Sequence, residues 1–490
     1  MRILHVTHEF PPYEFAGTAI YTFNIVRAQS EKHEVFVFSR LADNDRADYE
    51  IVDEDRGDYR VRLMNKPNLD WSKLANTYTD ERAEKLFAAY LDEVKPDLVH
   101  FQHILGLSHT VLAEVKRRGI GLVVTLHDFW TMCPMGQRMC YTDKQLCEEI
   151  DYKKCGPCCY GENWSWTEAD ERSAAAAEPS PAPSRPGFDE LFRHRVRYTP
   201  GTFARRPRAA LWAAGKTIQG LFGGVSELPE PEVLSNNPFA VRTRAMQAAL
   251  ANADLLITPS AFLRDEFVRL FGVPKEKIIH SPNGMKFDHV TRHPRSKSDV
   301  LRFGFVGSVI PTKGVHVLVE AARKLDGLSG FRVDIYGAPN QWTVAYDEEC
   351  KKSAEGHPQI SFKGRFDNKK IGEVLANMDV LVVPSIWYEN APLTLNEAAM
   401  TRTPVLASDR GGMLEFVRDN GYGRTFRLGD ADDLALKMRE LIEDPGKIPA
   451  LAATEVYIKP VDDNAHELEA IYERIVAGRA HGARDYVYGG

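Results

Sequence analysis

The strongest constraint on the fold is an alternation of short apolar runs and helical stretches that occurs twice along the chain. The helical pattern of residues 83–93, for example, stops before Pro96. Alternation of strands and helices at this spacing predicts a doubly wound α/β sheet. In the first block, the runs expected to form parallel strands buried on both faces are residues 3–7, 34–38, 98–101 and 122–126.

The second block repeats this pattern, with strands expected at residues 301–306, 332–336, 359–362, 380–383 and 404–407. A chain of 490 residues is too long for one core and suggests two domains. Ligands of open α/β sheets bind at the carboxyl ends of the strands. We therefore predict two Rossmann-like domains, residues 1–280 and 281–460, facing a central cleft that holds the active site. A C-terminal helix within residues 461–490 is expected to cross back to the first domain.

Residues 131–250 break the alternation and are predicted to be an insertion in the N-terminal domain. A flexible low-complexity piece is expected at residues 173–187, a helix near 242–253 and a strand at 255–258. Four thiolates of the insertion could close a structural zinc site, since Cys155 and Cys158 have chelate spacing. Unliganded reduced thiols, disulfides and an iron–sulfur cluster are the alternatives. The cysteines concerned are Cys133, Cys140, Cys147, Cys155, Cys158 and Cys159.

A basic stretch follows the low-complexity piece. Leu211, Ile218 and Phe222 share one helical face, and Arg205, Arg206, Arg208 and Lys216 flank them. A basic amphipathic helix of this kind can lie on an anionic membrane, which would suit a lipid-linked acceptor. The alternative is a helix packed on the N-terminal domain with solvated arginines.

The overall composition narrows the partners and the compartment. The formal net charge of −7 gives no general attraction for nucleic acid. No apolar run approaches the ~20 residues that span a bilayer, and the N-terminus lacks the apolar stretch of a signal peptide. We expect a cytoplasmic protein with no nucleic-acid partner, in peripheral membrane contact if the basic helix forms.

The most informative segment is residues 384–398, PSIWYENAPLTLNEA. It follows an apolar strand, and Asn390 suits a helix N-cap while Pro392 suits the first turn of a helix expected to run to about Arg402. The N-terminus of such a helix is a seat for a diphosphate. Glu389 and Glu397 would then hold the two ends of a nucleotide-sugar, although two solvated glutamates flanking an amphipathic helix would share this spacing.

A second loop supports this interpretation. A strand ends at Gly307, and Lys313 follows just before a helix that begins at Gly314. Glycine allows close backbone approach, and the lysine supplies a point charge for a leaving phosphate. The alternative is an ordinary surface lysine in a strand-to-helix loop.

With these segments in place, the chain resembles family 4 retaining glycosyltransferases of the GT-B fold. The C-terminal matches are V-G-S-x4-K-G at 306–314, Y-G-A at 336–338, E-x7-E-A at 389–398 and G-G-x2-E at 411–415. Ser281-Pro282-Asn283-Gly284 resembles the interdomain hinge of the family. The looser N-terminal matches are Pro11-Pro12 with Gly17, the histidines His100 and His103, and His127-Asp128.

The resemblance implies a retaining hexosyltransferase of glycan biosynthesis, using a UDP- or GDP-sugar and a glycan, lipid-linked or small-molecule acceptor, with no metal or other cofactor in catalysis. Lys313, Glu389 and His127 would be catalytic, and His103 and Asp128 would lie on the acceptor side. Donor-binding residues would be Glu397, Gly17, Gly307, Ser308, Gly337, Arg365, Asn390, Ala391, Pro392, Leu393 and Thr394.

One departure bears on the donor site. The family usually has an arginine at the position of Ser308, so one cation on the leaving diphosphate is missing, and Arg410 or Arg365 would have to compensate. Three alternatives stay open: a metal-dependent GT-A transferase, a GT-B phosphorylase or sugar-phosphate synthase, and a non-catalytic GT-B subunit. The acidic runs 43–45 and 53–55 would serve the first of these, but they are expected to be solvated loops.

Overall fold

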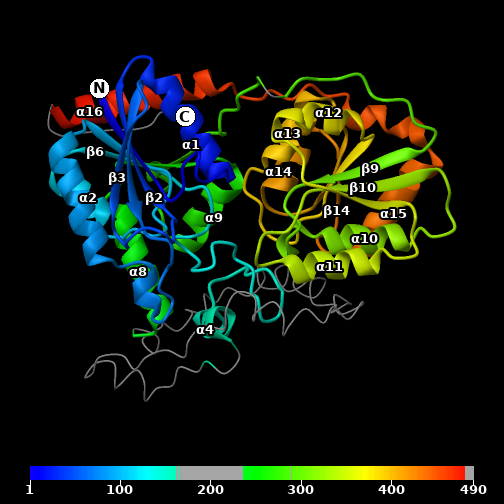
Figure 1. The fold of residues 1–490 in the computed structure, drawn as a ribbon, viewed down its shortest axis with the longest axis horizontal. Coiled ribbons are helices and arrows are strands. Elements are labelled where there is room, and N and C mark those ends of the chain that lie inside the picture. Colours follow the sequence, from blue (N-terminus) through cyan, green and yellow to red (C-terminus); the bar gives the residue numbers. More distant parts are fainter. Residues whose placement is uncertain (162–163, 165–235, 289, 481–490) are drawn as a thin grey trace, which may run out of the picture.

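The computed structural model describes residues 1–161, 164, 236–288 and 290–480. It consists of two α/β domains, each with a twisted sheet between layers of helices (Figure 1). The predicted architecture of two doubly wound domains is confirmed. The predicted low-complexity piece at 173–187 and the basic helix around 205–222 lie outside the described residues.

The N-terminal sheet has the strand order β3-β4-β2-β1-β5-β6-β7-β8, in which every pairing is parallel except β3 with β4. Its strands are β1 (Arg2–Thr7), β2 (Glu34–Leu41), β3 (Ile51–Asp55), β4 (Tyr59–Asn65), β5 (Leu98–Phe101), β6 (Gly121–Thr125), β7 (Leu255–Thr258) and β8 (Ile278–His280). The helices around it are α1 (Gly17–Ser30), α2 (Glu81–Val94), α3 (Val111–Arg117), α8 (Pro238–Ala251) and α9 (Ala261–Phe271), while α4 (Tyr152–Tyr160) lies apart from both sheets, at the bottom of the view (Figure 1).

The C-terminal sheet is parallel throughout, in the order β11-β10-β9-β12-β13-β14. Its strands are β9 (Leu301–Val306), β10 (Phe331–Tyr336), β11 (Ile360–Gly364), β12 (Val380–Val383), β13 (Val405–Ser408) and β14 (Arg424–Phe426). Its helices are α10 (Val315–Arg323), α11 (Val344–Ser353), α12 (Ile371–Ala376), α13 (Leu393–Met400), α14 (Gly411–Asn420) and α15 (Ala431–Glu443). Single 3₁₀ turns are η1 (Leu74–Thr77), η3 (Lys275–Lys277), η4 (Pro311–Lys313), η5 (Asn368–Lys370), η6 (Pro445–Lys447) and η7 (Pro449–Ala452).

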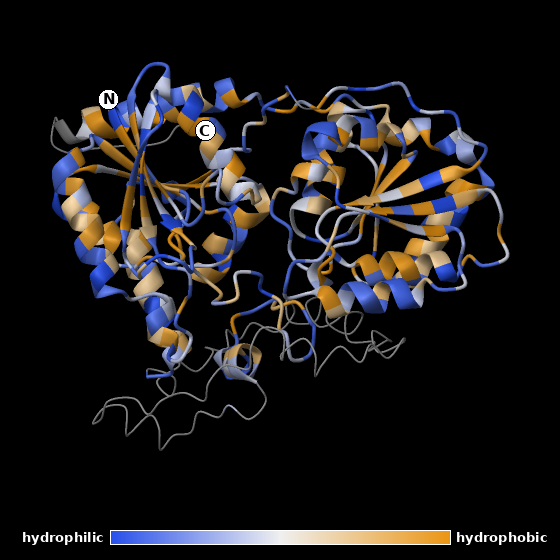
Figure 2. Cartoon of the chain, viewed as in Figure 1, coloured by the Kyte–Doolittle hydropathy of each residue, from blue (hydrophilic) through white to orange (hydrophobic). Residues whose placement is uncertain are grey.

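Apolar residues are concentrated on the strands and on one side of many helices (orange in Figure 2), and their buried side chains form the core of each domain. Strands such as β6 and β12 are buried along their whole length, which explains why their sequences are unbroken apolar runs. Helix α8 belongs to the N-terminal core through Phe239 and Met246. The chain has therefore returned from the insertion to the N-terminal domain by residue 238.

The expectation of a solvated loop at residues 53–55 is wrong. These residues belong to β3, an edge strand antiparallel to β4, in which Asp53 lies opposite Arg62. The two side chains form an ion pair at 2.6 Å. Charged residues are tolerated on an edge strand because one side faces solvent and the charges oppose further strand pairing.

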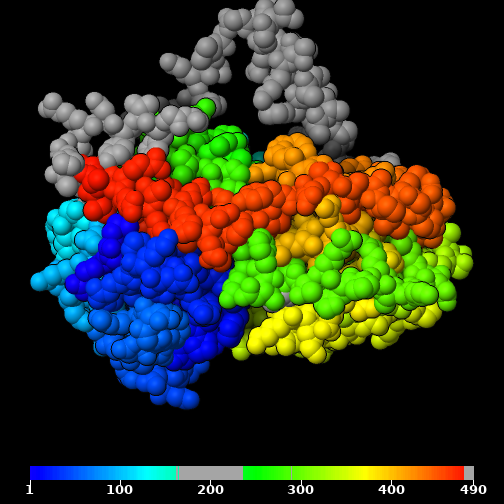
Figure 3. All heavy atoms as spheres, turned by 90° about the horizontal axis from the view of Figure 1, so that it is seen from above, coloured from blue at the N-terminus to red at the C-terminus, as the bar shows by residue number. Residues whose placement is uncertain are grey.

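Helix α16 (Val461–Ala480) leaves the C-terminal domain and crosses over the N-terminal one, as the space-filling view from above shows (Figure 3). Asn464 Oδ1 accepts hydrogen bonds from Tyr21 of α1 (2.9 Å) and from the backbone of Gly284 (3.1 Å). Glu467 accepts a bond from Ser281 at 2.9 Å. Helix α16 thus accepts hydrogen bonds from both ends of the connection between the domains, residues 281–284. Among the described helices, none has the length and apolar content needed to cross a bilayer.

Candidate active site

The loop after β12 buries a carboxylate that organises the C-terminal half of the site. The Glu389 side chain is 7% exposed, and its Oε1 accepts a 2.6 Å bond from Lys313 Nζ. The same oxygen accepts from Ser385 Oγ at 2.8 Å and from Trp387 Nε1 at 2.9 Å. Two residues predicted for the site, 76 positions apart, therefore form one ion pair. Ser385 and Trp387 were missed, although their alternation with Glu389 in the sequence was a signal.

A glycine brings the loop of Lys313 against the loop of Glu389. Gly314 has φ +70°, and a Cβ at this position would lie 1.9 Å from the carbonyl oxygen of Pro384. Ile386 N donates to Thr312 O at 2.8 Å across the same junction. Only glycine permits this approach, so the close packing of the two loops fixes Lys313 beside Glu389.

Helix α13 begins at Leu393, and its N-cap is Pro392, so the expectation that Asn390 is the N-cap is wrong. Asn390 Nδ2 instead donates to the carbonyl oxygen of His127, in the other domain, at 2.8 Å. The Oδ1 atom of Asn390, which would be the acceptor at an N-cap, has no hydrogen-bond partner among the described residues. The first residues of α1 and α13 are neighbours across the cleft, because a Cβ at Gly17 would lie 3.9 Å from Leu393 Cδ1. Two helix N-termini, each with the partial positive charge of its dipole, thus meet at one place.

Glu397 lies in the second turn of α13 and is 4% exposed. Unlike Glu389, its carboxyl group has no hydrogen-bond partner among the described residues. Burial alone raises the pKa of Glu397 to about 7. The Glu397 carboxyl group can therefore accept hydrogen bonds but receives none from the described residues, and neutral pH is close to its midpoint of ionisation.

His127 follows the last residues of β6 on the N-terminal side of the cleft. Its Nε2 lies 2.9 Å from Gln102 Oε1, and the ring of Tyr21 packs edge-on at 5.1 Å. Burial, with a smaller contribution from the charge of His103, lowers the pKa of His127 to about 3. The imidazole is therefore neutral at pH 7. Gln102 was not predicted, and its place between His100 and His103 at the end of β5 was the signal.

The predicted acceptor-side residues His103 and Asp128 are in contact. His103 Nε2 lies 3.2 Å from Asp128 Oδ2, and Trp130 N donates to Asp128 Oδ1 at 2.8 Å. Burial acts to raise the pKa of Asp128, but the charge of His103 and these hydrogen bonds outweigh it and hold the pKa below its usual value. The pair provides a negatively charged acceptor group near His127.

The glycines at the ends of β9 and β10 pack against each other. Gly337 has φ +146°, and a Cβ there would lie 1.8 Å from Gly307 O, so a side chain does not fit. Ser308 and Arg365 are exposed, and Arg365 reaches Pro339 O at 3.5 Å. Arg410 pairs with Asp409 at 2.9 Å. Arg365 and Arg410 are the cations expected to compensate for the missing arginine at position 308. In the described part of the chain, neither forms a hydrogen bond or ion pair with Lys313 or Glu389.

The C-terminal motif at 411–415 also joins the domains. Glu415 accepts hydrogen bonds from Ala261 N (2.9 Å) and Phe262 N (2.6 Å), the first two residues of α9. A carboxylate of one domain thus satisfies free amide groups at a helix N-terminus of the other.

Comparisons with known proteins identify the family of the chain. The family model described as glycosyl transferases group 1 matches residues 289–455, and that of glycosyltransferase family 4 matches residues 15–151. The D-inositol 3-phosphate glycosyltransferase of Rhodococcus opacus is 26% identical over 254 residues, 48% of this chain and 54% of that protein. A glycogen synthase of Mycobacterium tuberculosis is 30% identical over 197 residues, 39% of this chain and 46% of that protein. The chain spans about half the length of the curated relatives it matches.

Solved structures show the same fold over nearly the whole chain. Sucrose-phosphate synthase from Thermosynechococcus elongatus superposes with a TM-score of 0.58 at 17% identity, covering 98% of this chain and 97% of that one. Anabaena HepE in complex with UDP and glucose superposes with a TM-score of 0.54 at 14% identity, covering 98% and 99%. With the two family models matching both halves of the cleft, the chain belongs to the group 1 glycosyltransferases, of the family 4-like type with the GT-B fold.

Proposed function

We propose that the protein is a retaining glycosyltransferase that moves a sugar from a nucleoside diphosphate sugar to a hydroxyl of a glycan, lipid-linked or small-molecule acceptor, without a catalytic metal. The observation that carries this proposal is the Lys313–Glu389 ion pair of 2.6 Å beside the start of α13. A cation and a helix N-terminus at one point form a diphosphate site that needs no metal ion.

The donor would lie along α13. Its diphosphate would accept from the free amide groups at the start of the helix and from Lys313, and its ribose hydroxyls would donate to the unpartnered carboxylate of Glu397. A complex of HepE with UDP and glucose and one of a starch synthase with ADP and acarbose show that proteins of this fold bind such nucleotides.

In the proposed reaction, the bond between the sugar and the diphosphate breaks while the acceptor oxygen attacks from the same face. Lys313 and the dipole of α13 stabilise the charge that develops on the leaving phosphate, which is electrostatic catalysis. That phosphate can take the acceptor's proton, so no protein base is required. If Nε2–H of His127 donates to Gln102, the neutral ring keeps Nδ1 free to accept a bond from a sugar hydroxyl.

The test is thermal unfolding of the chain with UDP, GDP, ADP or dTDP, each with and without EDTA. A ligand that binds only the folded state adds about 2.7 kcal/mol of stability at one hundred times its Kd. We expect one nucleotide to raise the Tm, with EDTA having no effect on the shift. Glu397→Ala should abolish the shift, while Glu373→Ala, an exposed glutamate of α12, should retain it. Absence of a shift with all four nucleotides contradicts the proposal and favours a non-catalytic subunit.

A further inference from the structure

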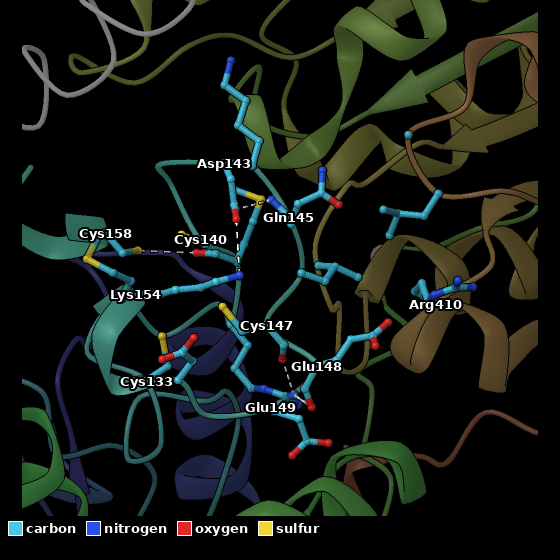
Figure 4. A pocket seen from close by; sticks show the side chains of 18 of the residues that line it. Cys133, Cys140, Asp143, Gln145, Cys147, Glu148, Glu149, Lys154, Cys158 and Arg410 are labelled. Carbon is cyan, nitrogen blue, oxygen red and sulfur yellow. Dashed lines mark hydrogen bonds and ion pairs between the residues drawn. The ribbon is translucent and has the colours of Figure 1, made fainter. Parts of the chain in front are cut away.

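The insertion that follows β6 lies against the C-terminal domain as well as its own. Its residue Met139 is 3% exposed and belongs to the apolar core of the C-terminal domain. A cavity of about 1110 Å³ separates other parts of residues 132–159 from that domain. Figure 4 looks into this cavity, with Cys133 and Cys147 on the insertion side and Arg410 across from them. The N-terminal domain thus contributes a side chain to the core of the other domain.

The cysteines of the insertion are free thiols. In the part of the chain that the structure describes, no group of three or more His, Cys, Asp or Glu side chains could hold a metal ion. The structural zinc site stays a prediction, and other side chains of the insertion make its contacts with the loop after β12.

A side chain of the C-terminal domain makes the reciprocal contact. Tyr388, in the loop after β12, is 7% exposed and belongs to the apolar core of the N-terminal domain. The centre of its ring lies 5.3 Å from that of Phe262 in α9 and 6.1 Å from that of Phe129. Each domain therefore places a side chain in the core of the other, and separating the domains would expose both side chains to water, which is unfavourable.

Arg138 of the insertion holds the Tyr388 ring in this position. It is 2% exposed, and its guanidinium carbon lies 5.1 Å from the ring centres of both Tyr388 and Phe129. Its Nη1 pairs with Glu266 of α9, and its Nη2 donates to the carbonyl oxygen of Glu148 at 3.1 Å. A buried guanidinium with these partners is held in one place, and its attraction for an aromatic ring is stronger away from water.

This contact bears on the Lys313–Glu389 ion pair because Tyr388 directly precedes Glu389. On the other side of Glu389, Asn390 donates to the carbonyl oxygen of His127 at 2.8 Å. Both neighbours of Glu389 are therefore attached to the N-terminal domain. Since Glu389 accepts the 2.6 Å bond from Lys313, contacts made by one domain set the position of the ion pair in the other.

We propose that Arg138 is a positioning residue of the transferase, which holds Tyr388, and through it Glu389 and Lys313, in the geometry that stabilises the leaving phosphate. This inference rests on the proposed function and gives the insertion a role in it. The ion pair is correctly placed only while the two domains are in contact, so closure of the cleft and assembly of the diphosphate site occur together. A misplacement of about 1 Å can lower a rate about 10²-fold, so a loosened loop should be visible in the kinetics.

A purely structural role for Arg138 predicts a different result. Loss of a structural contact lowers the free energy of unfolding and loosens the N-terminal domain as a whole. Loss of a positioning contact loosens residues 384–392 selectively, because these residues lie in the other domain and are held there by Tyr388.

Hydrogen exchange of the full-length chain, read by mass spectrometry, separates these two roles without any donor. In Arg138→Met, amide exchange in residues 384–392 should rise about tenfold or more, while exchange in β9 stays unchanged. Tyr388→Leu should give the same result, and Tyr388→Phe, which keeps the ring, should match the wild type. Phe87→Leu, which alters the N-terminal core at a ring that packs on Phe38 and Phe101, is the control for general destabilisation.

Unchanged exchange in residues 384–392 of Arg138→Met and Tyr388→Leu overturns the proposal, as does an equal rise in Phe87→Leu. If Arg138→Met does not fold, Arg138→Lys takes its place, because lysine keeps the charge beside Glu266 but loses the planar group that stacks on the rings. Its exchange in residues 384–392 should then lie between those of wild type and Tyr388→Leu.

Turnover provides the second measurement, as release of the nucleoside diphosphate from UDP-glucose, GDP-mannose, ADP-glucose or dTDP-glucose, whichever the wild type cleaves fastest. Arg138→Met should lower kcat by about 10–100-fold and change KM by less than about twofold, since the helix N-terminus and Glu397 still bind the nucleotide. Arg138→Lys should recover part of the loss, and Arg439→Met, at an exposed arginine of α15, should match the wild type.

A loss confined to KM, or a kcat unchanged in Arg138→Met, contradicts the positioning role. The nucleotide-induced Tm shift is measured on the same samples and should persist in every variant. Its absence from the wild type would contradict the proposed function, whereas its presence together with unchanged loop exchange in the variants would contradict this inference alone.

Discussion

The two walls of the cleft differ in the ionisable groups that they present. On the C-terminal wall, Lys313 forms an ion pair with the buried carboxylate of Glu389, and burial raises the pKa of Glu397 to about 7. On the N-terminal wall, burial lowers the pKa of four histidines, so these imidazoles are neutral at pH 7: His5, His8, His100 and His127. Among the described residues, the charge on this wall is a single carboxylate, Asp128, in contact with His103. This difference fits the proposed reaction, in which a diphosphate would need fixed charge and sugar hydroxyls would need hydrogen-bonding groups.

The largest expected effect comes from removing the cation of the C-terminal wall. Lys313→Ala should lower kcat by about 10²–10³-fold, since it removes stabilisation of the leaving phosphate and leaves Glu389 buried without its partner. Single-turnover rates with the donor identified by the Tm shifts would measure this. Lys369→Ala, an exposed lysine of η5, is the matched control. A loss in kcat of less than threefold in Lys313→Ala would show that the charge of Lys313 does not stabilise the leaving phosphate.

On the N-terminal wall, His127→Ala should lower kcat by about 10–100-fold, the equivalent of one hydrogen bond to the reacting sugar. Because the pKa of His127 is about 3, the wild-type rate should show no acidic limb near pH 6.5 that depends on this residue. A pH–rate profile of both chains checks this, with the exposed His293→Ala as control. A limb near pH 6.5 that disappears in His127→Ala would mean that the imidazole is charged in the complex.

Glu397 should couple nucleotide affinity to pH. If the ribose hydroxyls bind the ionised carboxylate, affinity should rise about tenfold between pH 6 and pH 8, as a group with a pKa of about 7 loses its proton. Glu397→Gln should bind weakly and without this pH dependence. Calorimetric titrations at three pH values would measure the slope, and an unchanged slope in the variant would assign it to another group.

The same carboxyl predicts a stability effect in the absence of ligand. The pKa of Glu397 is raised in the folded chain from 4.5 to about 7, so the folded state holds the extra proton between these values. The associated stability is lost as pH rises through 7. Glu397→Gln should therefore be more stable than wild type at pH 8, by about 1–3 kcal/mol, and of similar stability at pH 5. Urea unfolding at both pH values provides the comparison.

The smallest expected effect concerns the contact that joins the two walls. Glu415→Gln replaces the charged acceptor of the two amide groups of α9 and should cost about 1 kcal/mol of stability while leaving the chemical step unchanged. Urea unfolding and the KM for the donor would measure the two consequences. A large fall in kcat would instead place Glu415 in the transition-state machinery.

Much of this site followed from local sequence patterns. Apolar runs buried on both faces identified the strands, and the loops after β9 and β12 could then be assigned to the cleft because parallel strands end at one edge. Local patterns failed where a distant group intervened. Asn390 is a residue type favoured at helix N-caps, but in the structure its Nδ2 donates a hydrogen bond to the carbonyl oxygen of His127 in the other domain. Residues 53–55 resembled a solvated loop because Arg62, which balances Asp53, lies on another strand.

Two features depended on tertiary structure alone. The pairing of Lys313 with Glu389 spans 76 positions and needs Gly314 to approach Pro384. The burial of Arg242 in α8 could not be expected from its helix, because the carbonyl oxygens to which it donates, those of Thr131 and Trp130, lie 111 and 112 positions away.

By itself, the sequence determined the fold class and which loops carry the chemistry, because strand and helix periodicity and helix-start signals are encoded by neighbouring residues. Only the tertiary structure decided which side chains are paired and which are neutral. The physical reason is that ion pairing and pKa depend on burial and on distances between atoms, and these are set by segments far apart in the chain.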